Sequence, residues 1–394
     1  MRRLSDRTAG FTDSVIRRMT RVSLQHGAVN LSQGFPDFDP PAELLSRLAE
    51  VALSGPHQYS LTWGADNFRE ALAAKQSKFM GREIDPNGEI TVTCGGTEAM
   101  MAAMMTIANP GDKVIVFSPF YENYGADAIL SGAEPIYVPL RPPLFTFDAD
   151  ELEAAFKQEP KALILCNPSN PTGKVFTYDE LSVIAELATK YDAYVITDEV
   201  YEHIVYEPHV HTYMASLPGM FERTLSSGSL SKTYSITGWR IGYVIAPSRI
   251  TETLRKVHDF LTIGAAAPLQ EAAVVGLRMG DSYYRELLQA YTEKRDIFLK
   301  GLDNIGISYT KPEGAYYVML DISPFGYDSD AEFCMDLAEK VGVAAVPGSS
   351  FFRENVNHLI RLHFAKKKET LDEALNRLEA IWKLMPRKRQ TRTA

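Results

Sequence analysis

The chain has 394 residues, of which 45% are hydrophobic and 23% are charged, and its 41 basic and 50 acidic residues give a net charge of −9. This length exceeds what one hydrophobic core usually supports, so we expect two domains. The composition is that of an ordinary globular protein, and the acidic balance argues against a nucleic-acid-binding surface.

The three cysteines, Cys94, Cys166 and Cys334, are odd in number and lack the spacing of metal ligands. The sequence therefore predicts neither a disulfide framework nor a metal site, and we expect buried free thiols in a reducing, cytoplasmic compartment. No apolar run approaches the roughly 18 residues of a membrane span, so no membrane partner is expected. The basic segment 387–392 is typical of a solvated chain end.

In chain order, the first forty residues contain Pro36, Pro40 and Pro41, and we expect them to run between the domains. From about residue 90 to 246, short apolar runs alternate with longer amphipathic stretches. This alternation predicts an α/β fold, with a mostly parallel seven-stranded sheet and helices on both faces. The expected strands are Ile90–Thr93, Lys113–Phe117, Pro135–Val138, Ala162–Cys166, Ala193–Thr197, Thr224–Ser227 and Ile241–Ala246.

One connecting helix is marked by a capping box at Thr177–Glu180. After about Ser282 the pattern changes and predicts a smaller α+β domain. Its expected elements are a long charged helix, two short strands and a final helix, at Tyr283–Leu302, Tyr316–Leu320, Leu359–Phe364 and Leu371–Leu384. The predicted division is an N-terminal arm and small-domain segment, a large domain and a small C-terminal domain, at residues 1–40, 41–284 and 285–394.

A ligand site is expected at the carboxyl ends of the parallel strands. Lys232 lies there among hydroxyl residues, between two candidate strands. A desolvated lysine near another cation has a lowered pKa and can act as a nucleophile that forms imines. With Ser229 and Arg240 as phosphate ligands, this predicts pyridoxal phosphate held on Lys232 as a Schiff base. The alternative is a solvated lysine in a polar loop.

The strand Ile90–Thr93 is followed by Gly95, Gly96 and Thr97 and then by a predicted helix. Backbone N–H groups at such a turn can surround an anion, so these three residues are a candidate phosphate cup. A tight turn that serves only packing would have the same pattern.

Two further strand ends carry candidate cofactor ligands. Asn170 lies in the Pro-rich segment Asn167–Gly173 and could donate to a phenolate oxygen of the ring, although a plain connector is the alternative. Asp198 ends an apolar strand and could keep a ring pyridinium protonated, with a helix N-cap as the alternative. Tyr201 could share the phenolate oxygen with Asn170.

Arg361 lies in an alternating, strand-like segment of the small domain. An arginine there is usually exposed, but its fork could also bind a substrate carboxylate. His209 and His211 have no carboxylate or cysteine companions, which favours a surface position over a metal site.

These motifs, Ser229–Lys232 with Gly238–Gly242, Asn167–Gly173, Asp198–Tyr201 and Arg361–Ala365, resemble those of the class I/II pyridoxal-phosphate aminotransferases of fold type I in order and spacing. The resemblance extends from about Asn30 to the final helix. It implies that Lys232 anchors the cofactor and shuttles a proton, that Asp198 pairs with the ring nitrogen, and that Arg361 binds the α-carboxylate.

The resemblance implies further roles. It implies that Tyr59 crosses the interface of a homodimer to the neighbour's phosphate, and that the backbone of Gly34 meets the substrate. Tyr121 would be the ring-stacking residue, where relatives often carry tryptophan or phenylalanine, and stacking should survive that change. The cup has Cys94 beside its glycines where some relatives have a serine, which places one side-chain hydrogen bond in doubt.

The implied reaction is ping-pong transamination between an amino acid and a 2-oxo acid. The motifs are most similar to the kynurenine, glutamine and methionine aminotransferase subgroup, and the aromatic residues Phe35, Tyr59, Trp63 and Tyr121 suit an aromatic or neutral donor. Aspartate aminotransferase and cysteine-S-conjugate β-lyase remain as alternatives, and a cofactor-binding regulatory module is disfavoured because no helix-turn-helix domain fits before Asn30. The sequence leaves open the physiological donor and acceptor and the choice between dimer and tetramer.

Overall fold

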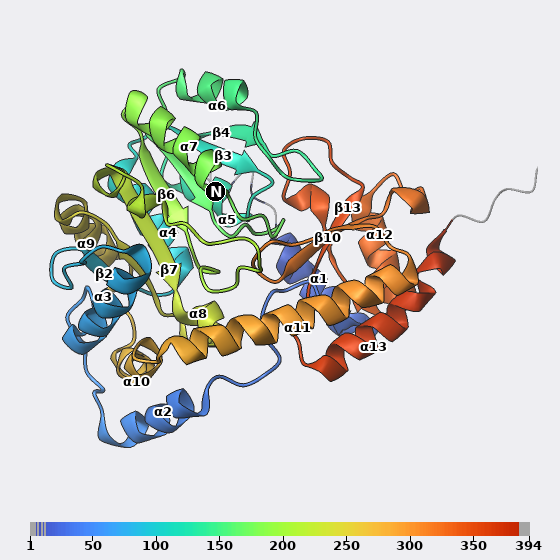
Figure 1. Ribbon diagram of the computed structural model, residues 1–394, viewed down its shortest axis with the longest axis horizontal. Coiled ribbons are helices and arrows are strands. Elements are labelled where there is room, and N and C mark those ends of the chain that lie inside the picture. Colours follow the sequence, from blue (N-terminus) through green and yellow to red (C-terminus); the bar gives the residue numbers. More distant parts are fainter. Residues whose placement is uncertain (1–4, 6–7, 9–10, 12, 386–394) are drawn as a thin grey trace, which may run out of the picture. The chain divides into compact units, whose positions relative to one another are not determined.

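The computed structural model describes residues 5, 8, 11 and 13–385 and divides into two compact units (Figure 1). Of the described residues, the first unit comprises 5, 8, 11, Phe38–Ala290 and Glu313–Ala315, and the second comprises 13–37, Tyr291–Pro312 and 316–385. Among the described residues, no helix combines the length and apolar character that are needed to cross a bilayer.

The first unit is built on a seven-stranded sheet with the order β2-β8-β7-β6-β5-β3-β4. Strand β8 is antiparallel to both of its neighbours, and the other pairs in the sheet are parallel. The mostly parallel sheet is therefore confirmed. Its strands are β2 (Ile90–Thr93), β3 (Lys113–Ser118), β4 (Glu134–Pro139), β5 (Ala162–Cys166), β6 (Tyr194–Asp198), β7 (Thr224–Ser229) and β8 (Gly242–Ile245).

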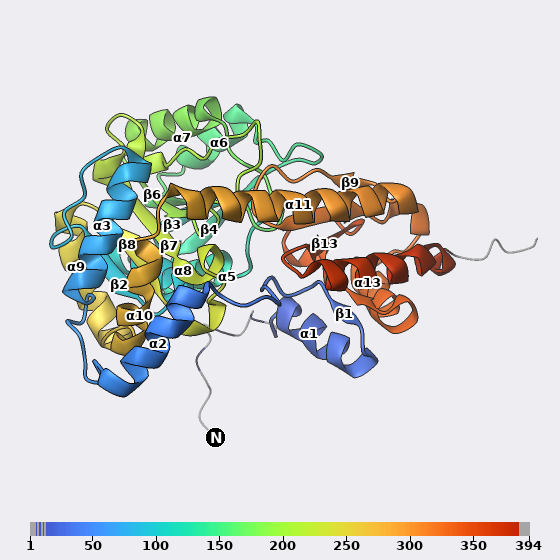
Figure 2. The same cartoon turned by 60° about the horizontal axis from the view of Figure 1, so that its bottom comes forward.

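Helices cover both faces of this sheet. On β8, Val244 belongs to one apolar cluster, whereas Tyr243 and Ile245 belong to another, because successive side chains of a strand point to opposite faces. The second cluster packs against α2, α3 and α10, which lie side by side in Figure 2. The helices of this unit are α2 (Ala42–Ser54), α3 (Asp66–Met80), α4 (Gly96–Ile107), α5 (Asn123–Leu130), α6 (Ala149–Phe156), α7 (Tyr178–Lys190), α8 (Leu230–Thr233), α9 (Ser248–Thr262) and α10 (Ala267–Leu277).

The predicted capping box is present at the start of α7. The Thr177 side chain accepts from the backbone N–H of Glu180, and the Glu180 side chain accepts from the backbone N–H of Thr177. Two orphan N–H groups are thereby satisfied, which fixes where the helix begins.

The second unit contains a four-stranded antiparallel sheet with the order β12-β13-β10-β9. A separate parallel pair joins β1 and β11. The strands are β1 (Val29–Asn30), β9 (Tyr309–Thr310), β10 (Tyr317–Asp321), β11 (Val343–Ala344), β12 (Val346–Pro347) and β13 (Leu359–His363), and the helices are α1 (Val15–His26), α12 (Asp330–Asp336), α13 (Lys368–Leu378) and the later part of α11 (Asp281–Ile305).

The chain before Pro36 is more regular than the sequence analysis predicted. Helix α1 is capped by the Ser14 side chain at its start and by Gly27, with φ of 59°, at its end. Strand β1 then pairs with β11 inside the second unit.

The three cysteines are free thiols, as expected. Cys334 is buried, but Cys94 and Cys166 are only partly buried, so the expectation of three buried thiols is wrong for these two.

Candidate functional site

The predicted phosphate cup lies where β2 leads into α4. Gly95 has φ of 82°, a backbone conformation that favours glycine, and α4 begins at the next residue. A Cβ atom on Gly95 would lie 2.4 Å from Nη2 of Arg240, and one on Gly242 would lie 2.4 Å from the backbone carbonyl carbon of Gly95. Both glycines are therefore needed to bring Arg240 against the N-terminus of a twelve-residue helix.

Ser229 lies beside the same turn, because a Cβ atom on Gly96 would be 3.6 Å from the Cβ of Ser229. The Ser229 hydroxyl lies 3.0 Å from the carbonyl oxygen of Ile241 and accepts from the backbone N–H of Ser231 at 3.1 Å. Thr97 is exposed in the first turn of α4. The structure thus gathers all five predicted phosphate ligands, Gly95, Gly96, Thr97, Ser229 and Arg240, in one unit.

Asp198 is a buried carboxylate at the carboxyl end of β6. Its oxygens accept from the Tyr124 hydroxyl at 2.6 Å and from the backbone N–H of Val200 at 3.3 Å. Burial raises the pKa of Asp198, against the lowering effects of Tyr124, Val200 and the charge of Lys232. Lys232 is the cation whose charge acts on this carboxylate, and a buried carboxylate is stabilised further when a cationic hydrogen-bond donor reaches it.

Lys232 lies on the short helix α8, directly after β7. Its Nζ atom is 5.9 Å from the centroid of the Tyr201 ring, and its charge acts on the carboxylate of Asp198. The structure therefore brings Lys232, Tyr201 and Asp198 together, although they belong to two different strand ends.

Asn170 is buried in the loop after β5, as predicted for a ligand that points inward. Its backbone N–H bonds to the Cys166 thiol. The ring of Tyr121, the predicted stacking residue, is half-buried and lies 5.8 Å edge-on from the ring of Tyr124.

The sequence analysis missed Tyr124 and Asp127, which lie one turn apart on α5. Tyr124 supplies the shortest contact to Asp198, and burial, with the Asp198 charge as a second cause, raises the pKa of Asp127 to about 8. Tyr124 lies near the start of the apolar helix α5, a pattern that sequence cannot distinguish from core packing.

In the second unit, Arg361 lies on β13 and is only 1% exposed, so the alternative of an exposed arginine is wrong. Its guanidinium lies 4.3 Å from the centroid of the Tyr317 ring and 4.7 Å from that of Phe351, and it donates to the carbonyl of Ser32 at 2.8 Å. The two aromatic faces hold the cation by cation–π contact and fix its direction.

Gly34 lies in this unit as well. Its carbonyl accepts from the Tyr316 hydroxyl at 2.9 Å, and a Cβ atom at this position would lie 2.2 Å from the hydroxyl oxygen of Tyr317. Only glycine fits against Tyr317, which agrees with a position where the backbone approaches another group closely.

Two aromatic residues expected near the substrate have other neighbours. The guanidinium of Arg255 lies 4.8 Å from the Trp63 ring, and Nζ of Lys366 lies 4.5 Å from the Phe35 ring. Tyr59, in contrast, is 84% exposed.

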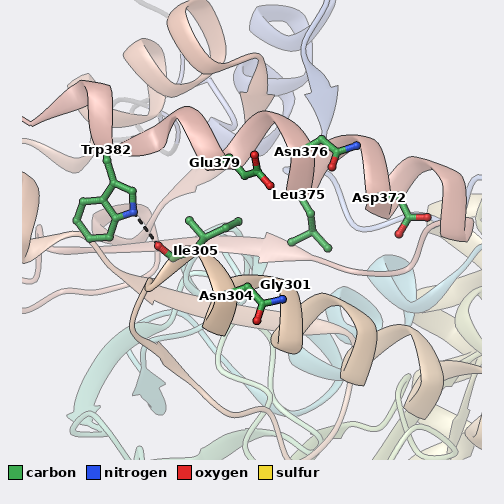
Figure 3. A pocket seen from close by; sticks show the side chains of 8 residues that line it. All are labelled: Gly301, Asn304, Ile305, Asp372, Leu375, Asn376, Glu379 and Trp382. Carbon is green, nitrogen blue, oxygen red and sulfur yellow. Dashed lines mark hydrogen bonds between the residues drawn. The ribbon is translucent and has the colours of Figure 1, made fainter.

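A separate groove in the second unit contains none of the predicted site residues (Figure 3). One of its walls is fixed by the Trp382 indole, which donates to the carbonyl of Ile305 at 2.8 Å. The lining residues are Gly301, Asn304, Ile305, Asp372, Leu375, Asn376, Glu379 and Trp382.

The residues of the first unit fit pyridoxal phosphate. The glycine turn, the helix N-terminus and Arg240 form a cradle for a phosphate, and Asp198 is a buried carboxylate suited to a ring N–H. No cluster of three or more potential metal ligands occurs in the part of the chain that the structure describes.

Comparisons with known proteins agree with this geometry. The sequence model of the aminotransferase class I and II family matches residues 27–378. A probable N-succinyldiaminopimelate aminotransferase of Mycobacterium tuberculosis is 37% identical over 94% of this chain and 96% of its own length. The solved structure of the N-succinyldiaminopimelate aminotransferase from that species has a TM-score of 0.93 at 38% identity and covers 96% of this chain and 100% of its own.

Two other relatives carry different substrate names. The methionine aminotransferase of Escherichia coli is 38% identical over 93% of this chain and 96% of its own length. The kynurenine–oxoglutarate transaminase 3 of Rattus norvegicus is 36% identical over 93% of this chain and 88% of its own length. The chain therefore belongs to the class I and II aminotransferases and is a pyridoxal-phosphate-dependent transaminase of fold type I.

Proposed function

We propose that this transaminase moves an amino group from an aromatic or neutral L-amino acid to a 2-oxo acid by a ping-pong mechanism, with the roles assigned below. The carrying observation is the buried carboxylate of Asp198, on which the charge of Lys232 acts and whose pKa burial raises. A carboxylate buried in this way is stabilised when a cofactor brings a cationic N–H to it.

Pyridoxal phosphate, when bound, supplies a protonated ring that withdraws electrons from the substrate Cα. Lys232 would hold the cofactor through Nζ and, once released, carry a proton to and from Cα. Asp198 would accept the ring N–H, while Asn170 and Tyr201 would donate to the phenolate oxygen. Tyr121 would stack on the ring. The phosphate would be held by Gly95, Gly96, Thr97, Ser229 and Arg240.

Arg361 would bind the substrate α-carboxylate, and the backbone of Gly34 would contact the substrate. The methionine and kynurenine specificities that the relatives' names carry support a donor with an aromatic or neutral side chain.

A homodimer, with Tyr59 reaching the neighbour's phosphate, is part of the same proposal. Its support is the exposure of large apolar side chains in the first unit, with Tyr59 at 84% and Phe260 at 94%. Leu261 and Ile263, which follow Phe260 closely in the chain, are exposed as well. Exposed apolar surface of this kind is typical of protein interfaces. We also propose a cytoplasmic location, which the three free thiols support.

An N-succinyldiaminopimelate donor is a second candidate, favoured by the similarity to the Mycobacterium tuberculosis relative along nearly the whole chain. Aspartate transamination and β-elimination from cysteine conjugates are further outcomes that the experiment below separates.

The test is a half-reaction screen of the purified, cofactor-loaded protein. Each candidate donor is mixed with the enzyme, and the visible absorbance of the bound cofactor is followed. We expect a rapid decrease with aromatic amino acids, methionine or glutamine. A decrease with aspartate, glutamate or N-succinyldiaminopimelate alone would overturn the proposed donor class, and pyruvate release from a cysteine conjugate would indicate elimination.

Lys232→Ala should abolish both the visible absorbance of the covalently held cofactor and nearly all turnover, because no other group there replaces its amine. The exposed Lys256→Ala variant serves as the matched control and should behave as the unaltered protein. Substantial turnover in Lys232→Ala would refute the assignment of Lys232.

A further inference from the structure

Glu98 and His258 form a buried pair behind the predicted phosphate cup. Glu98 lies in the first turn of α4, and His258 lies on α9, 160 positions later in the chain. Nδ1 of His258 is 2.6 Å from Oε1 of Glu98, and the Thr262 hydroxyl donates to the same oxygen at 3.0 Å. The histidine is fully buried, so both groups are shielded from water.

The geometry defines the protonation state of this pair. Nε2 of His258 lies 2.8 Å from the carbonyl oxygen of Thr62, while Nδ1 faces the carboxylate. Both ring nitrogens therefore face acceptors, and only an imidazolium can donate from both. In agreement, hydrogen bonding to Glu98 raises the pKa of His258 despite its burial, and His258 lowers that of Glu98.

Each end of the pair holds a different segment. Oε2 of Glu98 accepts from the backbone N–H of Cys94 at 2.5 Å, directly before Gly95 of the cup. Nε2 of His258 holds the carbonyl of Thr62, three residues after Tyr59. The Cys94 thiol lies 3.6 Å from the carbonyl oxygen of Gly264, which adds a contact between the cup and the chain after α9.

We propose that Glu98 and His258 are positioning residues whose ion pair holds the phosphate cup and the Tyr59 segment, residues 59–64, in register with each other. Neither residue touches the reacting atoms. The pair acts through the Cys94 N–H on one side and the Thr62 carbonyl on the other.

In the homodimer of the proposed function, on which this step rests, the Glu98–His258 pair would lie between two phosphate sites. If Tyr59 reaches the phosphate of a second copy of the chain, the cup on one side of the ion pair serves the chain's own cofactor, and the segment on the other side serves the neighbour's. The pair would then link the two phosphate sites of the dimer through one buried contact in each chain.

The first test uses hydrogen exchange of the apoprotein, read by mass spectrometry on peptides that cover residues 59–64 and 90–97. We expect Glu98→Gln and His258→Gln each to speed exchange in both segments by about tenfold, since each removes a charged, buried hydrogen bond. Acceleration in 59–64 by Glu98→Gln is the decisive result, because among the described residues Glu98 reaches that segment through the hydrogen bond of His258 to Thr62. Exchange that changes only beside the altered residue would overturn the proposal.

The second test measures the dissociation constant of pyridoxal phosphate for the apoprotein. Both variants should weaken binding by about tenfold, whereas kcat at saturating cofactor should fall much less. The double variant should be no weaker than either single variant, because the two residues act as one unit. Equal losses in affinity and kcat, or additive losses, would contradict a positioning role.

Two further variants control for folding. Thr262→Val removes the hydroxyl contacts to Glu98 and to Nδ1 of His258 but leaves the ion pair, and it should cause a smaller change in the same two segments. Lys256→Gln removes an exposed charge from the same helix and should change neither segment. If the unaltered protein did not bind the cofactor, the proposed function would be wrong. The hydrogen-exchange result on the apoprotein would still show whether the ion pair connects residues 59–64 with residues 90–97.

Discussion

Two buried carboxylates of the first unit have opposite electrostatic environments. Glu98 is paired with the His258 ring, accepts the Cys94 N–H, and has a lowered pKa. Among the described residues, Asp198 accepts from the Tyr124 hydroxyl and the Val200 N–H, the charge of Lys232 acts on it, and burial raises its pKa. A carboxylate that already has an imidazolium partner suits a positioning role, whereas one whose pKa is raised by burial suits a ligand that brings a cationic N–H.

The largest expected effect is a difference in kcat between variants of Asp198 and variants of Glu98. Asp198→Asn keeps the shape but removes the charge that holds the ring proton, so we expect kcat to fall by about a thousandfold or more. Glu98→Gln should leave kcat within about tenfold at saturating cofactor. Steady-state rates of the loaded proteins check this, and equal losses in the two variants would remove the distinction.

The next largest effect is on the free energy of unfolding of the apoprotein, which Glu98→Gln should lower and Asp198→Asn should leave unchanged or raise. Glu98→Gln leaves the His258 cation unpaired, and we expect the free energy of unfolding to fall by about 3 kcal/mol. Asp198→Asn removes a charge that burial disfavours, so the apoprotein should be as stable as the unaltered chain or more stable by about 1 kcal/mol. Urea unfolding at pH 7.5 and one protein concentration measures both, and a loss in Asp198→Asn equal to that in Glu98→Gln would break the comparison.

The pH dependence of the free energy of unfolding of the apoprotein tests whether His258 is charged in its pair with Glu98. The pKa of His258 is raised in the folded state, so its contribution is complete below the unfolded value of 6.5 and is lost as pH rises through the folded value. The difference in unfolding free energy between the unaltered chain and His258→Gln should therefore be about 2 kcal/mol at pH 6 and less than half of that at pH 9.

Other titratable groups face the same pair. Cys94 lies beside Glu98, and Asp259 follows His258 on α9. The exposed His57→Gln variant is the matched control and should show no such trend. A difference that grows with pH would show that the ring is neutral in the folded chain.

The smallest effect concerns the residue that supports Asp198. Tyr124→Phe removes the 2.6 Å hydrogen bond and keeps the ring, so the carboxylate loses one of its two donors. We expect kcat to fall by about three- to tenfold, because Asp198 holds its charge less firmly. Tyr121→Phe, which keeps the predicted stacking ring without removing a donor to Asp198, should have a smaller effect. Measuring kcat for both variants tests whether Tyr124→Phe lowers it more than Tyr121→Phe does.

The sequence predicted local features better than contacts between distant segments. Apolar runs of four to six residues marked the strands of the large sheet to within two residues at either end, and the capping box fixed the start of α7. Lys232, Asp198 and Arg361 could be proposed because each stands in a short motif. Tyr124 and His258 could not, since their partners lie 74 and 160 positions away and no local pattern records such a pair. The guanidinium of Arg255 lies 4.8 Å from the centroid of the Trp63 ring, another contact between distant segments that no local pattern records.

The central claim is that Asp198 obtains its cationic partner from the cofactor. The most direct measurement is the ¹⁵N chemical shift of the ring nitrogen in labelled pyridoxal phosphate bound to the protein. The account predicts a protonated ring nitrogen at pH 8 in the unaltered chain and an unprotonated one in Asp198→Asn. A ring nitrogen that is unprotonated in the unaltered chain, or protonated in both proteins, would contradict it.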